Sequence, residues 1–181
     1  MVPLHEYAVV SQDATILEAI TALDDAQKRL PPGRHKHRAV LATNDKGEIV
    51  GKAGHLSFLR ALEPKYNELG DVDALSKVGL SADFISSMMD HYRFFRDTLT
   101  DLCRPASNMK VRDIMRPVTE SIEEDASLCE AIHRMVMWQT LSILVTRGKE
   151  IVGLLRVSDI FQEVTESIKG LAESTSHDRQ E

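Results

Sequence analysis

Apolar side chains recur at helical spacing in two separate stretches of the chain, and the same polar signal precedes both. Thr15-x-x-Glu18 and Ser127-x-x-Glu130 have the form of a capping box, in which the hydroxyl and the carboxylate satisfy backbone N–H groups at the start of a helix. The apolar positions that follow are Ile16, Leu17, Ile20 and Leu23 in the first stretch and Leu128, Ile132, Met135 and Val136 in the second. One apolar face of this kind predicts an amphipathic helix after each box.

Two short apolar runs, joined by a turn that contains glycine, follow each predicted helix. The runs are Ala39–Ala42 with Ile49–Gly51, and Ser142–Val145 with Ile151–Gly153. This arrangement predicts a β-hairpin. An extended segment precedes each helix, at Tyr7–Val10 and Val118–Ile122, and a last helix follows each hairpin, from His55 to about Leu62 and from Ser158 to about Ile168. The chain therefore predicts a β-α-β-β-α unit twice.

The two predicted units are also related in sequence, because Asp13–Ile20 recurs in similar form as Asp125–Ile132. We expect an α/β (α+β) fold in which two such units pack as a pseudo-two-fold pair. The expected parts are a first repeat at 1–62, a helical insertion at 63–110, a second repeat at 111–170 and a disordered tail at 171–181. Two equivalent units usually bury exposed faces on each other, so function is expected in the cleft between them.

The insertion carries its own helical pattern. Apolar residues recur near every third or fourth position at Phe84, Ile85, Met88, Met89, Tyr92, Phe95, Leu99 and Leu102. The pattern predicts a helix of roughly twenty residues that begins at Ser81 and is broken at Pro105. A shorter helix is expected at 72–78. We expect the apolar face to be buried, either against the two repeats or against the same insertion of a second subunit.

Composition narrows the class of protein. The 181 residues are 43% hydrophobic and 28% charged, as in ordinary globular proteins, and the net charge of −6 disfavours nucleic acid as a partner. Neither a signal peptide nor a membrane span is apparent, so we expect a cytoplasmic protein without a membrane partner. Cys103 and Cys129 have no metal-site or disulfide spacing and are expected to be buried.

Three segments of the second repeat carry a family resemblance. They are Val111-Arg112-Asp113-Ile114-Met115, Asp125-x-x-Leu128-x-Glu130-Ala131-Ile132, and Ile151-Val152-Gly153-Leu154-Leu155-x-x-Ser158-Asp159-Ile160. Together they resemble a CBS domain. The first repeat matches at Asp13–Ile20 and Ile49–Gly51 but lacks the opening motif. The resemblance implies a tandem pair, or Bateman module, that binds adenosine-containing ligands.

The resemblance also implies binding residues from both repeats. Asp159, which follows Ser158, would hold the ribose, since an ionised carboxylate has two acceptor oxygens for a vicinal diol. Tyr7 and Ala8 would lie beside the adenine. His37 and Arg38 would reach the phosphates, for which the guanidinium supplies a planar fork. Asp159 has an alternative role as a stabiliser of its own helix start, and the basic run Arg34–Arg38 has one as a solvated loop.

Two positions depart from the family pattern. Arg156 stands where the family usually has Thr or Ser, and it either strengthens a phosphate contact or fills the pocket. In the first repeat the positions that correspond to Arg156 and Asp159 are Gly54 and Ser57, so that cleft lacks the carboxylate. We expect one competent cleft and one that is weak or empty.

No catalytic or metal-binding motif is evident. His35 and His37 have no third ligand nearby in sequence, so no metal site and no enzymatic activity are expected. The leading hypothesis is a regulatory pair that requires no cofactor, senses AMP, ADP or ATP, signals to a protein partner and forms a homodimer. The alternative is a structural or dimerisation module with decayed clefts. A nucleotide-modifying enzyme is a third possibility, but its catalytic residues are not visible.

Overall fold

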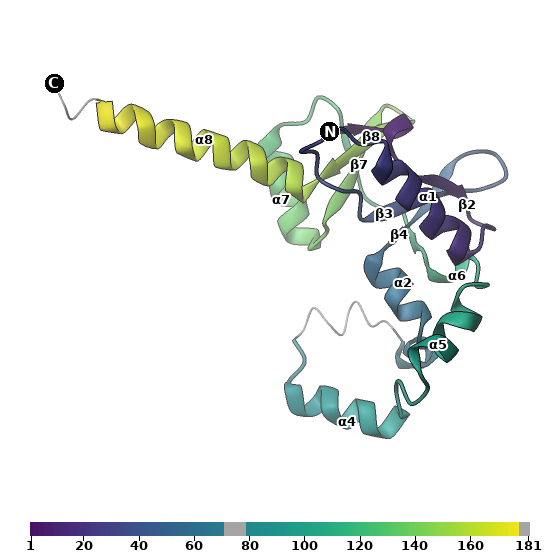
Figure 1. Ribbon diagram of the computed structural model, residues 1–181. Coiled ribbons are helices and arrows are strands. Elements are labelled where there is room, and N and C mark those ends of the chain that lie inside the picture. Colours follow the sequence, from purple (N-terminus) through teal and green to yellow (C-terminus); the bar gives the residue numbers. More distant parts are fainter. Residues whose placement is uncertain (71–78, 178–181) are drawn as a thin grey trace. The chain divides into compact units, whose positions relative to one another are not determined.

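The structure is a computed structural model that describes residues 1–70 and 79–177. The chain divides into two compact units, and each unit collects several segments (Figure 1). One contains Met1–Tyr7, Ala26–His37 and the chain from Val118 onward, and we call it the Asp159 unit. The other contains Ala8–Asp25 and Arg38–Pro117, and we call it the Ser57 unit.

The Asp159 unit is built on a four-stranded sheet with strand order β1-β8-β7-β6. Its elements are β1 (Val2–Pro3), η1 (Leu4–Glu6), β6 (Ser121–Glu123), α7 (Leu128–Trp138), β7 (Ser142–Arg147), β8 (Glu150–Arg156) and α8 (Val157–His177). β6 runs parallel to β7, whereas β8 is antiparallel to both of its neighbours. The core lies between the sheet and the two long helices, and it consists of Ile122, Ala131, Met135, Ile143, Val145 and Ile160.

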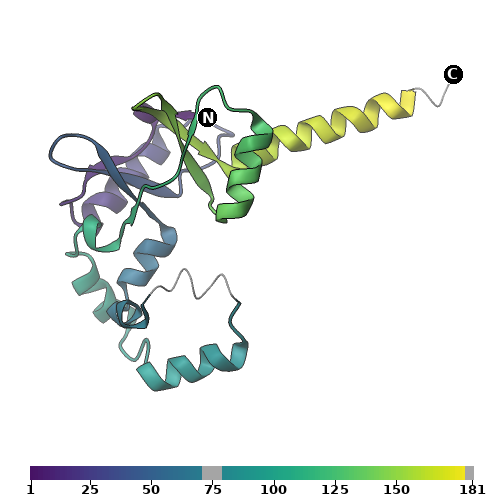
Figure 2. The same ribbon diagram turned by 180° about the vertical axis from the view of Figure 1, so that it is seen from behind.

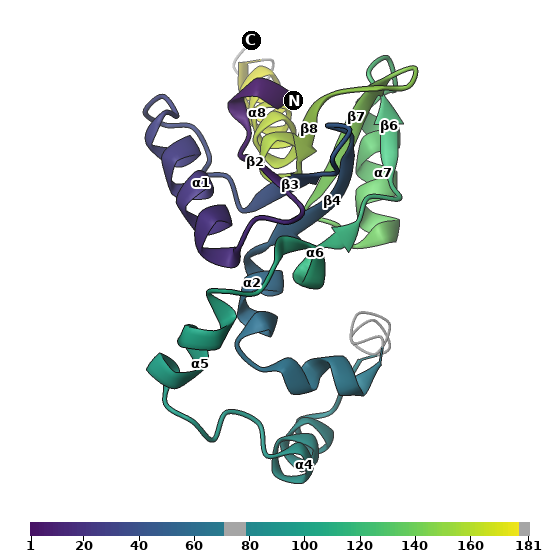
Figure 3. The same cartoon turned by 90° about the vertical axis from the view of Figure 1, so that its right-hand side faces the viewer.

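The Ser57 unit has a second four-stranded sheet with strand order β2-β3-β4-β5. Its elements are β2 (Val9–Ser11), β3 (Ala39–Thr43), β4 (Ile49–Gly54), α2 (His55–Ala61), η2 (Pro64–Leu69), α4 (Ala82–Tyr92), α5 (Leu99–Ala106), α6 (Val111–Ile114) and β5 (Arg116–Pro117). α1 (Ile16–Lys28) begins in this unit, and its last residues from Ala26 belong to the Asp159 unit. Figure 3 shows α6 beside α2, where Ile16, Ala61 and Ala106 form a buried cluster. The mixed α/β (α+β) class with two β-α-β-β-α units is confirmed.

Each sheet takes an edge strand from the segment that opens the other repeat. β1 comes from the start of the first repeat and pairs with β8, and β5 comes from the start of the second repeat and pairs with β4. The two Val-Gly pairs that recur in the repeats, Val50-Gly51 and Val152-Gly153, lie at these contacts. A Cβ on Gly153 would lie 2.6 Å from the carbonyl oxygen of Val2, and one on Gly51 would overlap the side chain of Met115. Glycine at both positions is therefore required by close approach of the edge strand.

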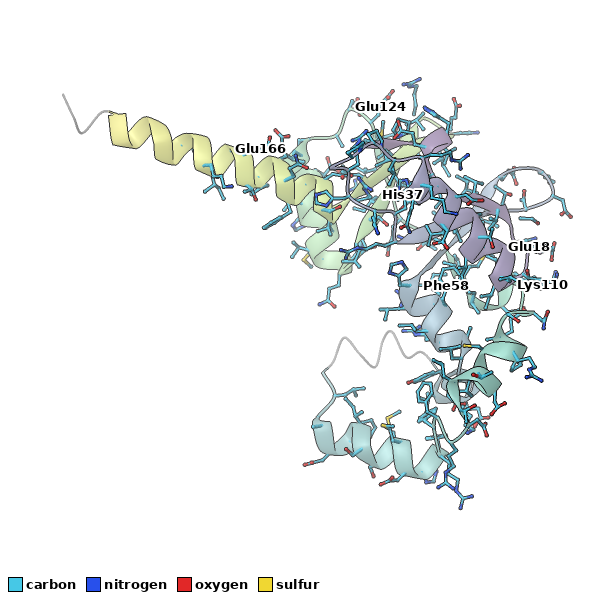
Figure 4. All side chains as sticks on the ribbon, in the orientation of Figure 1. Glu18, His37, Phe58, Lys110, Glu124 and Glu166 are labelled. Atoms are coloured by element: carbon cyan, nitrogen blue, oxygen red, sulfur yellow. The ribbon has the colours of Figure 1, made fainter. Side chains whose placement is uncertain are left out.

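Both predicted capping signals start their helices, but only the first forms a complete box. The Thr15 N–H donates to the Glu18 carboxylate at 2.6 Å, and the Glu18 N–H donates to the Thr15 hydroxyl at 3.2 Å. Thr15 and the neighbouring Lys110 lower the pKa of Glu18, and Figure 4 shows Glu18 and Lys110 on adjacent elements. In the second signal the Glu130 N–H donates to Ser127, while the Glu130 carboxylate accepts a hydrogen bond from Arg134.

The predicted single helix of the insertion is wrong. α4 ends at Tyr92, because Arg93 and Phe95 adopt left-handed backbone angles (φ of 54° and 52°), and α5 begins only at Leu99. Phe94 is buried and stacks on Tyr66 with ring centroids 4.9 Å apart, and the Phe95 N–H donates to the Glu63 carboxylate at 2.8 Å. These contacts turn the chain and override the continuous helical pattern. The predicted helix at 72–78 lies outside the described residues.

Other expectations differ from the structure at the surface. Cys103 and Cys129 are exposed, so the prediction that they are buried is wrong, because they lie on the outer faces of α5 and α7. No residue of α4 is buried, and Phe84, Ile85 and Met89 remain half exposed. α8 continues to His177, past the predicted end near Ile168, and residues 178–181 lie outside the described part of the chain.

Candidate functional site

The strongest candidate site surrounds the junction between β8 and α8. β8 ends at Arg156, which lies opposite Ser142 of β7, and α8 begins at the next residue. The Val157 N–H donates to the Leu141 carbonyl at 2.9 Å and fixes the first turn of the helix. Asp159 lies in that first turn, where free backbone N–H groups favour a negative charge.

Arg156 and Asp159 form a bidentate ion pair. Arg156 Nε donates to Asp159 Oδ2 at 2.9 Å, and Arg156 Nη2 donates to Asp159 Oδ1 at 2.5 Å. The Arg156 side chain is only 7% exposed, and that of Asp159 is 20% exposed. The remaining Nη1 group donates to the backbone carbonyl of His35 at 2.8 Å. Arg156 thus joins the basic run to the start of α8.

The ionisation of Asp159 follows from this pair. Burial raises the pKa of the Asp159 carboxyl, but the hydrogen bonds and positive charge of Arg156 outweigh burial, and the pKa is lowered overall. The amino terminus of the chain lowers it further. Asp159 is therefore an ionised carboxylate at neutral pH, with one Arg156 nitrogen on each oxygen.

Tyr7 and His37 form a buried aromatic pair in the same unit. Their ring centroids lie 4.4 Å apart, with an interplanar angle of 54°. Burial raises the pKa of Tyr7 to about 12, and the nearby charge of Arg156 partly opposes this shift. Tyr7 is consequently a protonated phenol at neutral pH, able to donate a hydrogen bond.

His37, labelled in Figure 4, is the more unusual member of the pair, because it is fully buried and neither ring nitrogen has a hydrogen-bond partner among the described residues. Burial lowers the pKa of His37, and the positive charge of Arg156 lowers it further. The backbone and the negative charge of Glu6 raise the pKa of His37 in part. The Glu6 carbonyl nevertheless makes no hydrogen bond of normal geometry to the ring. His37 is held instead through its backbone, since Gln27 Nε2 donates to the His37 carbonyl at 3.2 Å.

The Asp159 unit thus contains five of the seven predicted binding residues: Tyr7, His37, Arg156, Ser158 and Asp159. Tyr7 and His37 both lie within electrostatic range of Arg156 and Asp159. The other two predicted residues, Ala8 and Arg38, belong to the Ser57 unit. Ala8 is buried, with its carbonyl accepting from the Leu41 N–H, and the exposed Arg38 accepts from the His55 N–H through its carbonyl.

Two participants in this region were missed by the sequence analysis. Glu6 lies 3.7 Å from the Arg34 guanidinium and faces the basic run, and the His35 carbonyl receives the third Arg156 donor. Both depend on contacts between distant segments, so no local sequence pattern indicates them.

The corresponding position of the first repeat differs in chemistry. Gly54 is the N-cap residue of α2, Ser57 is buried in its first turn, and that turn contains no acidic residue. A hydroxyl group there can form only neutral hydrogen bonds, which are weaker than those of a carboxylate.

An open surface hollow of about 600 Å³ lies elsewhere on the Asp159 unit. Its lining includes Glu123, Asp125, Glu130 and Arg134, and none of the predicted binding residues contributes to it. Within the described ranges, no three His, Cys, Asp or Glu side chains are grouped so that they could hold a metal ion. Over the same ranges, no helix combines the length and the apolar character needed to cross a membrane.

Comparison with known proteins finds a family match for part of the chain. The family model of the CBS domain matches residues 111–166, which include the candidate site at the β8–α8 junction. Residues 111–166 are therefore identified as a CBS domain. CBS-domain proteins are generally regulatory rather than catalytic. No curated protein matches the sequence of the chain.

Solved structures share the fold at low sequence identity. A CBS-domain-containing protein from Agrobacterium tumefaciens is 14% identical, with a TM-score of 0.54 over 86% of this chain and 82% of that one. CBSX2 in complex with AMP is 14% identical, with a TM-score of 0.55 over 92% of both chains. A CBS-domain-containing protein of unknown function from Kribbella flavida is 21% identical, with a TM-score of 0.52 over 88% of this chain and 92% of that one.

Proposed function

We propose that this CBS-domain protein is a regulatory module that senses an adenine nucleotide, such as AMP, ADP or ATP, and signals its occupancy to a protein partner. The observation that carries the proposal is the ionised Asp159 carboxylate in the first turn of α8, beside Arg156 and the Tyr7–His37 pair. A carboxylate in this position has acceptor oxygens that suit the two hydroxyl groups of a ribose. The complex of CBSX2 with AMP supports this ligand class.

The remaining roles follow from chemistry and exposure. Tyr7 and Ala8 are proposed to contact the base, and Ser158 and Asp159 the ribose. Arg38 is exposed and is the more accessible phosphate ligand, because contact with the buried His37 ring requires the side chains that cover it to move. We propose that the first repeat spans residues 1–62 and the second repeat spans residues 111–170. The insertion at 63–110 is the proposed surface for the protein partner.

Regulation requires that the nucleotide bind two arrangements of the protein with different affinities, because only this difference shifts their populations. The half-exposed apolar side chains of α4, namely Phe84, Ile85 and Met89, offer a surface through which a partner protein would detect the change. An apolar patch of this kind is typical of a docking helix.

We also propose a homodimer, joined through α8. Figures 1 and 2 show α8 extending well beyond α7 and the sheet of its own unit. Its apolar residues alternate at spacings of four and three, which is the pattern of a coiled-coil seam: Val157, Phe161, Val164, Ile168 and Leu171. Val164 also packs partly against the core of its own unit, so the exposed part of the seam is formed mainly by the other four residues. Phe161, Ile168 and Leu171 are each more than 60% exposed. The flanking Ser158, Thr165 and Ser167 carry no charge, so two identical helices meet without repulsion there.

Isothermal titration calorimetry with AMP, ADP and ATP tests the nucleotide proposal. We expect at least one nucleotide to bind the wild type, and Asp159→Ala to weaken that binding about ten-fold or more, since it removes a charged hydrogen-bond acceptor. Asp83→Ala is the matched control, because Asp83 also lies in the first turn of a helix but on the exposed face of α4. Undiminished binding to a folded Asp159→Ala protein contradicts the proposed ribose contact.

The second candidate function is a ligand-free structural or dimerisation module. The observation that favours it is the Arg156–Asp159 pair, which places a guanidinium on both carboxylate oxygens. A protein of this kind shows no thermal shift with any adenosine compound at millimolar concentration. A ligand that binds only the native state must raise the apparent stability, so a shift rejects this alternative.

A further inference from the structure

The Arg156–Asp159 pair has consequences for ligand choice. Arg156 engages both oxygens of the carboxylate that the proposed function assigns to the ribose, through contacts of 2.9 Å and 2.5 Å. A ribose diol would donate its two hydroxyl groups to the same two oxygens. With only 20% of the Asp159 side chain exposed, the diol and the guanidinium compete for the approach to the carboxylate.

A neutral ligand supplies no negative charge to replace Asp159 as the partner of Arg156. Arg156 is almost fully buried, and among the described residues its one other hydrogen bond goes to the neutral carbonyl of His35. If a diol displaced it from Asp159, the guanidinium would be left in a buried position without an anion, which is strongly unfavourable. A ligand that brings its own anion removes this penalty, because the guanidinium then exchanges one anionic partner for another.

We propose that Arg156 is a specificity-determining residue that makes binding depend on a phosphate group: the guanidinium leaves Asp159 for the phosphate, and the freed carboxylate receives the ribose. This inference rests on the proposed function and deepens it. It assigns the protein a phosphorylated nucleoside as ligand and excludes the free nucleoside at comparable affinity.

The surroundings of Arg156 support such an exchange. A guanidinium has five N–H donors, and the hydrogen bonds to Asp159 and His35 use one on each nitrogen, so N–H groups remain for a phosphate oxygen. The loop that Arg156 contacts carries Arg34 and Lys36, whose side chains are exposed and add positive charge in the same unit. Arg156 also donates to the His35 carbonyl, so movement of its guanidinium would change the hydrogen bond that holds this loop. Ligand binding would thereby change the position of the segment that precedes β3.

The test compares adenosine with AMP by calorimetry on the full chain. For the wild type we expect AMP to bind at least about ten-fold more tightly than adenosine, since a charge-assisted contact is gained. In Arg156→Thr, which restores the residue type usual in the family, the carboxylate is free. We expect adenosine to bind about ten-fold more tightly to this variant than to the wild type, while AMP loses affinity. Arg156→Lys keeps the charge without the fork, and we expect intermediate values.

The outcomes separate the two proposals. A gain in adenosine affinity in Arg156→Thr supports the exchange, because a residue that only contacts phosphate would leave adenosine binding unchanged and a residue that only holds the loop would weaken both ligands. Wild-type protein that binds adenosine as tightly as AMP overturns the exchange and leaves the proposed function standing. Arg156→Thr that binds adenosine when the wild type binds neither ligand shows a permanent block and also overturns it. If neither protein binds either ligand, the proposed function itself fails.

Discussion

The carbonyl oxygen of Val2 lies against Gly153, at the point where a side chain of residue 153 would begin. An added Cβ would lie 2.6 Å from that oxygen, which is closer than real contacts allow. The two residues belong to β1 and β8 and come from opposite ends of the sequence. The pairing of β1 with the sheet of the Asp159 unit therefore depends on the absence of a side chain at residue 153.

Gly153→Ala is expected to destabilise the protein by about 1–3 kcal/mol, the range found for overpacked sites. The new methyl group forces β1 away from β8, because the atom that it meets is backbone and cannot rotate aside. Urea unfolding followed by circular dichroism measures the change in the free energy of unfolding.

Gly170→Ala is the matched control for this prediction. The same methyl group added at residue 170 meets nothing within 4 Å, and residue 170 lies inside α8. Alanine there should raise stability by about 0.5–1 kcal/mol through helix propensity. Equal effects of the two substitutions would contradict the close approach of Val2 and Gly153.

His37 should make stability depend on pH in the mildly acidic range. Burial and the charge of Arg156 lower the pKa of His37 in the folded protein below the value of about 6.5 that a free histidine has. Between the two values the unfolded chain binds more protons than the folded one, so the free energy of unfolding rises with pH. The contribution of His37 is complete above about pH 6.5 and is lost as the pH falls toward the folded-state pKa.

His37→Phe tests this dependence while it keeps an aromatic ring beside Tyr7. Thermal unfolding at pH 7 and pH 5 should show a larger loss of stability on acidification in the wild type than in the variant. At pH 7 the variant should be at least as stable, because the buried ring nitrogens of His37 have no partners to lose among the described residues. An identical pH response of the two proteins would show that His37 is not buried as a neutral group.

The proposed α8 seam predicts an assembly that charge should disrupt. Phe161→Glu and Ile168→Glu each place a carboxylate at an exposed apolar position of the seam, and in a dimer the two copies would repel each other. Analytical ultracentrifugation should find a dimer for the wild type and monomers for both variants. Gln162→Glu adds the same charge next to the seam and should leave the dimer intact. A monomeric wild type, or dimers that persist in both seam variants, would contradict the seam.

The alternation of polar and apolar residues was sufficient to predict both repeats. Thr15 and Glu18 form the predicted capping box, and Asn44–Glu48 forms the turn of the first predicted hairpin, with Gly47 at a φ of 78°. These features depend on contacts within a few residues, so their signal is complete in the local sequence. Local sequence patterns fail in the insertion. There the buried Phe94 and its contact with Tyr66 end a helix that apolar periodicity alone would continue.

For the candidate site, the sequence by itself determined which groups are present: an acid at the start of a helix, an arginine three residues before it, and a basic run far away in the chain. Only the tertiary structure decided that Arg156 engages both oxygens of Asp159 and reaches the His35 carbonyl, and that His37 is buried without a partner for its ring. The same holds for the exchange of β1 and β5 between the repeats. Each of these features joins segments through side-chain geometry and desolvation, which depend on distances in space, whereas a sequence pattern reports only distances along the chain.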